Sequence, residues 1–146
     1  MYQYKTCGLN TVYLANGYDT AEFDGEIATS IHDIDGLHKA IGRNLAELSR
    51  ALTGSEFRFL RVEMDMSQKA LGLLLDKTDQ SVANWEKSNN IPRTSDVTVR
   101  HLYLESIGEN PLMKSFLEQF NAVDRSHQEE HMNFIESHEG WELNAA

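Results

Sequence analysis

Four polar residues near the middle of the chain have a spacing that places them on one side of a short helix. Gln80 and Asn84 are four residues apart, and residues at that separation are neighbours on a helix surface. A glutamine or asparagine amide can make two hydrogen bonds to the adenine edge in the major groove of duplex DNA. The candidate base contacts are therefore Thr78, Gln80, Ser81 and Asn84.

Basic and amide side chains surround this polar run and supply candidate contacts to DNA phosphates. The candidate phosphate contacts are Gln68, Lys69, Lys77, Lys87 and Arg93. Gln68 begins the helix expected before the run, where free backbone N–H groups also favour an anion. Asp79 is an exception, because a carboxylate repels phosphate unless it accepts from cytosine N4. We expect Asp79 instead to cap the helix that follows it.

The small and apolar residues of the same stretch fit two short helices that cross closely. Gly72 leaves room for the second helix, and Val82 and Trp85 lie on that helix's inner face. Two short helices joined by a tight turn make a helix-turn-helix, whose second helix enters the major groove. The stretch therefore predicts a helix-turn-helix whose outer face reads DNA.

This stretch resembles the Cro/Xre family of helix-turn-helix DNA-binding proteins. The similar positions are Ser67-Gln68, Leu71-Gly72, Gln80-Ser81-Val82 and Trp85-Glu86-Lys87. The resemblance implies that Arg61, on the preceding helix, forms a structural ion pair with Glu86. The family usually has glycine in the turn, where this chain has Asp76, a residue that tolerates left-handed backbone better than most.

A wider resemblance, to the MqsA-type antitoxins, covers most of the chain. The similar segments are 4–9, 14–18, 35–38 and 52–61. The N-terminal domain of those antitoxins usually binds zinc through paired cysteines. Cys7 is the only cysteine here, so we expect no structural zinc and no other metal or cofactor. The resemblance implies a homodimer that binds a palindromic DNA operator, represses its own operon and neutralises a toxin protein.

The expected fold is mainly α, with a five-helix Cro/Xre helix-turn-helix domain and a small N-terminal β-meander plus helix. Residues 1–53 form the strand-plus-helix module, 54–123 the DNA-binding domain, and 124–146 an acidic C-terminal tail. Two or three short strands within 1–34 lead to a helix that Asp35 caps and Thr53-Gly54 ends. The expected caps of the later helices are Ser55, Ser67, Thr78 or Asp79, and Thr94 or Ser95.

The C-terminal third leaves several alternatives open. A fifth helix begins at Asn110-Pro111, and its apolar face at Phe116, Leu117 and Phe120 either closes the core or forms the seam of the dimer. The acidic tail is either disordered or docks on a partner through isolated apolar residues, Phe134, Ile135 and Trp141.

Two groups of residues resemble metal ligands, but we expect neither to bind metal. His127 and His131 have the spacing of metal ligands on a helix, yet they lie in a polar tail and are interpreted as solvated surface. Cys7 with His32 or His38 would make an unusual site, and a plain core cysteine is the simpler interpretation.

Composition excludes several classes of protein. The 146 residues hold 13 Lys+Arg and 23 Asp+Glu, a net charge of −10, which argues against a generic polycation that coats nucleic acid. The longest apolar stretch, 70–75, is too short to cross a membrane, and the first residues do not resemble a signal peptide, so we expect a cytoplasmic protein. No nucleophile elbow or phosphate-binding glycine loop occurs, so we expect no enzyme.

Two rivals to the repressor remain. One is a plain transcriptional regulator without a toxin. The other is a protein-interaction module that has lost DNA binding, which the negative charge favours and the polar face at Gln80 and Asn84 opposes.

Overall fold

The N-terminal region of the computed structural model consists of two separate antiparallel strand pairs. The structure describes residues 1–108 and 133–143. Strand β1 (Tyr2–Gln3) pairs with β2 (Tyr13–Leu14), and β3 (Tyr18–Phe23) pairs with β4 (Glu26–Ile31). Asp24 and Gly25, which join β3 to β4, both have positive φ, as a tight two-residue hairpin requires. The strands therefore form two ribbons in place of the expected single meander.

Helix α1 (Ile34–Ala46) is shorter than its apolar spacing predicts and starts two residues earlier. Its N-cap is Asp33, whose side chain accepts from the Gly36 N–H, and not Asp35. The predicted continuation to Leu52 is wrong: Glu47 is the C-cap, and from the Leu48 carbonyl onward the backbone bonds to side chains outside the helix. The Leu52 N–H donates to the buried carboxylate of Asp96 at 2.9 Å. Leu48 and Leu52 still reach the core, but from an irregular segment that contains a turn and two bends.

Four further helices follow α1, and their starts correct two of the expected caps. They are α2 (Gly54–Glu63), α3 (Gln68–Leu74), α4 (Asp79–Ser88) and α5 (Arg93–Ile107). Thr53, and not Ser55, caps α2, through a capping box with Glu56. Pro92 precedes α5 and no side chain caps that helix, so neither Thr94 nor Ser95 does so.

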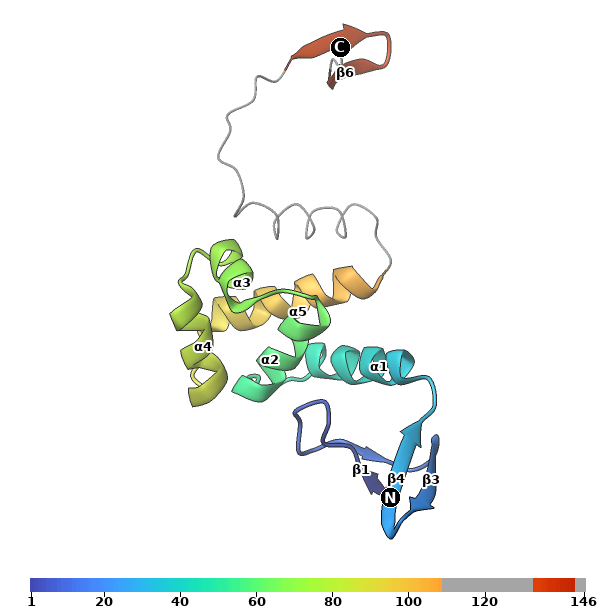
Figure 1. Ribbon diagram of the computed structural model, residues 1–146. Helices are drawn as coiled ribbons and strands as arrows, with labels where there is room; N and C mark the ends of the chain where they lie inside the picture. The colour runs from blue at the N-terminus through green and yellow to red at the C-terminus, as the bar shows by residue number, and fades with distance from the viewer. Residues whose placement is uncertain (109–132, 144–146) are drawn as a thin grey trace.

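One apolar core joins the N-terminal residues to the helices. Its fully buried members on the helices include Phe57, Leu60, Leu71, Val82 and Val99. Leu9 and Leu45 belong to the same cluster. Helix α1 packs along α5 and α2 (Figure 1). Helix α5 approaches α1 so closely at Gly42 that a Cβ there would lie 2.2 Å from the Tyr103 ring.

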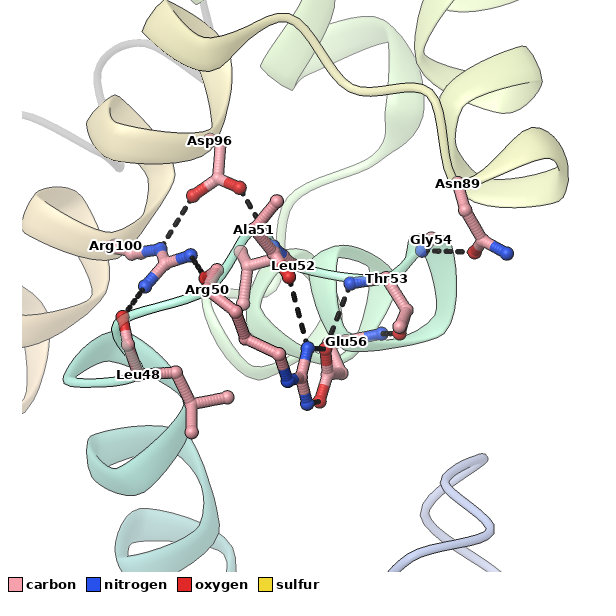
Figure 2. A network of polar contacts seen from close by, with 10 residues as sticks. All are labelled: Leu48, Arg50, Ala51, Leu52, Thr53, Gly54, Glu56, Asn89, Asp96 and Arg100. Carbon is pink, nitrogen blue, oxygen red and sulfur yellow. Dashed lines mark hydrogen bonds and ion pairs between the residues drawn. The ribbon is translucent and has the colours of Figure 1, made fainter.

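A polar network holds the irregular segment 47–53 against α5. Figure 2 shows Asp96 accepting from Leu52 on one oxygen and from Arg100 on the other. Arg100 also donates to the carbonyls of Leu48 and Arg50. Three backbone groups of this connection, the Leu48 and Arg50 carbonyls and the buried Leu52 N–H, therefore have partners on α5, which fix the path of the chain.

The same segment anchors the beginning of α2. Arg50 makes a bidentate pair with Glu56, with both N–O distances 2.8 Å, and Glu56 also accepts from the Thr53 N–H (Figure 2). Burial raises the pKa of Glu56, but the hydrogen bonds from Arg50 and Thr53 outweigh that effect, so its pKa lies below the ordinary value of 4.5.

The described part of the predicted acidic tail is an ordered hairpin. Strands β5 (Phe134–Ser137) and β6 (Gly140–Leu143) pair in antiparallel register, with Phe134 opposite Leu143 and Glu136 opposite Trp141. Of the two alternatives left open for the tail, disorder does not hold for these residues, and docking on a partner stays a prediction. The predicted helix from Asn110-Pro111 to 121 and the pair His127 and His131 lie outside the described residues.

Candidate nucleic-acid interface

A tight turn brings α3 and α4 together. The Ser67 side chain caps α3 by accepting from the Ala70 N–H. The Gly72 carbonyl accepts from the Lys77 N–H at 2.7 Å, and a Cβ on Gly72 would lie 2.7 Å from the Lys77 carbonyl oxygen. Only glycine permits this approach without displacement. Asp76 takes the left-handed conformation of the turn, with φ 57°.

The inner face of α4 is fixed by apolar packing. Val82 is fully buried, and the Trp85 ring meets the Phe57 ring edge to face at a centroid distance of 6.0 Å. This geometry is a favourable one for two aromatic rings. This packing therefore fixes the orientation of α4 relative to α2.

The carboxyl-terminal end of α4 abuts the first residue of α2. A Cβ on Gly54 would lie 2.2 Å from the Glu86 carbonyl oxygen, and the Gly54 N–H donates to the Asn89 side chain at 2.6 Å. Asn89 itself is left-handed and ends α4. Sequence analysis missed this contact, and an asparagine directly after a helical pattern was the available signal for the helix end.

A buried ion pair ties α4 to α2 on a second side. Arg61 Nε donates to Glu86 Oε2 at 2.8 Å and Arg61 Nη2 to Glu86 Oε1 at 2.9 Å. Arg61 Nη1 donates to the Met66 carbonyl at 2.9 Å. Both charged groups are almost fully buried. The pair orients α4 more than it adds stability, because desolvation offsets much of the attraction.

Two of the four candidate base contacts, Gln80 and Asn84, lie on the outer face of α4, whereas Thr78 is exposed just before the helix and Ser81 is half-buried. Thr78, and not Asp79, is the N-cap, since its side chain accepts from the Ser81 N–H at 3.1 Å. Gln80 and Asn84 are exposed, and the Gln80 amide donates to the Asn84 amide oxygen at 3.0 Å. The correction for Asp79 has a simple cause. Asp79 is the first helical residue, and its carboxylate accepts from the adjacent Gln80 N–H.

The candidate phosphate contacts do not form one group. Lys69, Lys77 and Lys87 are exposed on or next to α3 and α4. The Gln68 amide instead donates to Glu86 Oε1 at 3.2 Å, so in this structure it supports the buried pair. Arg93 is exposed at the start of α5, where it lines a groove described below.

The residues considered for a metal site have other partners. The Cys7 thiol donates to the Tyr4 carbonyl, and His38 lies between the Tyr4 hydroxyl and the Glu63 carboxylate. His32 pairs with Asp19. Within 1–108 and 133–143, no three His, Cys, Asp or Glu side chains are grouped to hold an ion. None of the helices in these ranges has the length and apolar character to cross a bilayer.

Comparison with known proteins gives no relative. No family model, no curated protein and no solved structure matches this chain.

Proposed function

We propose that this protein is a sequence-specific DNA-binding repressor that acts as a homodimer on a palindromic operator. The proposal rests on one observation: Gln80 and Asn84 are exposed side by side on α4, while Val82 and Trp85 bury its opposite face. A rigid helix with adjacent amides outside is the arrangement that base readout needs. The fold proposed with this function is the Cro/Xre helix-turn-helix.

The hydrogen bond between the two amides defines what they offer to a base. It uses one Gln80 N–H and the Asn84 oxygen, and leaves the Gln80 oxygen and the Asn84 N–H groups free. The free oxygen matches the adenine N6–H donor, and a free N–H matches the N7 acceptor. A pair preset in this way loses less side-chain entropy when it binds.

The charges near α3 and α4 imply modest and salt-sensitive affinity. Residues 54–92 contain five basic and six acidic side chains, of which Glu56 and Glu86 are already paired with arginines. The exposed Asp76 and Asp79 oppose Lys77. If all four cationic candidates of each subunit reach phosphates, the logarithm of the binding constant falls with the logarithm of salt with a slope of about −7.

A toxin–antitoxin role is the sharper form of the proposal. It rests on the resemblance of the N-terminal segments to MqsA-type antitoxins, and the plain regulator without a toxin is its nearest alternative. The net charge of −10 favours the rival protein-interaction module. A small basic ribonuclease-like reading frame beside the gene favours the antitoxin.

Selection from a random duplex library, followed by fluorescence anisotropy at fixed salt, tests DNA binding. We expect a palindromic site, and we expect Gln80→Ala or Asn84→Ala to weaken it by about 1–3 kcal/mol, roughly 5- to 150-fold. Asn44→Ala, an exposed asparagine on α1, is the matched control and should bind as the wild type does. Failure to enrich any palindrome at low salt contradicts the proposal.

A further inference from the structure

A groove runs along the face of α5 that is turned away from the core. It has a volume of about 580 Å³ and lies between α5 and the segment 46–51. Its apolar lining includes Leu48, Ile91, Val97 and Leu104. Val97 is 43% exposed, which is high for a valine in the middle of a helix. This α5 groove has the size and lining of a binding site.

The α5 groove is basic although the chain is acidic. Three arginines and one aspartate line it, against a net charge of −10 for the whole protein. Arg50 and Arg100 are held by Glu56, Asp96 and backbone carbonyls. Arg93 and His101 make no ion pair or side-chain hydrogen bond within the described parts of the chain. The groove therefore offers unused positive charge beside an apolar floor.

The C-terminal hairpin, β5 with β6, has the complementary surface. Its residues 133–143 contain Glu136, Glu139 and Glu142 and no lysine or arginine. The register places Phe134, Glu136 and Trp141 on one face, because directly opposed and alternate residues share a face. Trp141 is 72% exposed. A two-stranded hairpin is marginally stable alone, so this aromatic and acidic face needs a partner to pack on.

We infer that the C-terminal hairpin of one copy docks in the α5 groove of a second copy, and that the hairpin of the second copy docks in the groove of the first. Among residues 1–108 and 133–143 nothing covers either surface, and a reciprocal exchange covers both with one two-fold operation. Phe134 and Trp141 then cover the apolar floor, and Glu136 faces Arg93 and His101. The inference rests on the homodimer of the proposed function. Its contacts involve none of the candidate base contacts, but they occupy Arg93, so Lys69, Lys77 and Lys87 are the cationic candidates that stay available for phosphates.

Sedimentation equilibrium of the full chain without DNA, over a range of concentrations, tests this arrangement. We expect a dimer. Val97→Glu in the groove, or Trp141→Ser in the hairpin, should weaken it at least about 30-fold, the effect of losing a central contact. The matched controls are Val62→Glu (45% exposed, on α2) and Phe23→Ser (73% exposed, on β3), which should leave the dimer unchanged.

Mixing the two defective variants shows whether the hairpin docks on a second copy or on the groove of its own chain. A Val97→Glu chain keeps an intact hairpin, and a Trp141→Ser chain keeps an intact groove, so their mixture regains one good contact. We expect heterodimers in the mixture and monomers of each chain alone. If circular dichroism shows that Val97→Glu is unfolded, His101→Glu takes its place.

Three results would overturn the inference: a monomeric wild type, a dimer that neither variant weakens, or no recovery on mixing. Gln80→Ala with Asn84→Ala should leave the dimer intact. If mixing restores the dimer while no DNA is bound, the proposed function fails and the docking stands. If DNA is bound but mixing does not restore the dimer, the docking inference fails and the proposed function stands.

Discussion

Removing the Glu86 carboxylate should destabilise the protein strongly, because its partner cannot leave the interior. In Glu86→Ala, the Arg61 guanidinium loses both hydrogen bonds to the carboxylate and keeps only the one to the Met66 carbonyl. Gln68 loses its acceptor as well. Breaking a buried pair by removing one partner costs about 3–5 kcal/mol.

Urea unfolding, followed by circular dichroism, measures this loss. With a slope of about 1.5 kcal/mol per M, the midpoint should fall by roughly 2 to 3 M. Glu105→Ala, an exposed glutamate on α5, is the control and should change the free energy of unfolding by less than about 0.5 kcal/mol.

A double variant shows whether the Arg61–Glu86 ion pair mainly stabilises the protein or mainly orients α4. Arg61→Met with Glu86→Leu removes both charges and keeps similar volume, and it should recover most of the lost stability. Two results would refute the reasoning. One is a Glu86→Ala midpoint equal to that of Glu105→Ala, and the other is a double variant less stable than Glu86→Ala.

Three further predictions concern the scaffold. Gly54→Ala should lower Tm by several degrees, since its Cβ would lie 2.2 Å from backbone of α4. Gly108→Ala, at φ −72° and with the nearest atoms 3.5 Å from the added Cβ, is the control and should change Tm little; differential scanning calorimetry compares them. Asp96→Ala should cost about 3–5 kcal/mol in urea unfolding, because it leaves a buried N–H and a guanidinium without their acceptor, and a loss below 1 kcal/mol contradicts this. The contribution of Glu56 should be complete above its ordinary pKa of 4.5 and disappear as the pH falls through its lower folded pKa. The stabilities of wild type and Glu56→Gln should therefore converge only in acid, and a constant difference down to pH 3 would refute it.

The sequence predicted the turn and the helices around it well, because the information there is local. Ser67 and Thr78 lie just before apolar helical patterns, and each caps a helix through a residue three positions on. Gly72 marks the close approach. The exposed position of Gln80 and Asn84 follows from the burial of Val82 and Trp85 on the other face.

The segment after α1 could not be predicted in the same way. Leu48 and Leu52 continue the helical spacing, so periodicity alone extends the helix to them. The residue that ends this pattern, Asp96, lies 44 positions beyond Leu52 in the sequence. Arg100 lies 52 positions beyond Leu48. Tertiary partners of this kind override local propensity, and no pattern within 35–53 reveals them.

The α5 groove was also beyond the reach of the sequence. In the sequence Arg93 is one more cation near the helix-turn-helix, and only the fold places it in one groove with Val97 and segment 46–51. The tail residues Phe134 and Trp141 seemed isolated, whereas strand pairing places them on one face.

The network around Asp96 limits how this protein can be rearranged. Both ends of the seven-residue connection 47–53 are fastened, one to Arg100 and the other to the capping box at Thr53. A loop that is hydrogen-bonded at several points along its length cannot accept an inserted residue without breaking some of those bonds, unlike an ordinary surface loop. The first 46 residues therefore cannot be exchanged for another module by way of a longer linker, and natural variation in length should fall outside this connection.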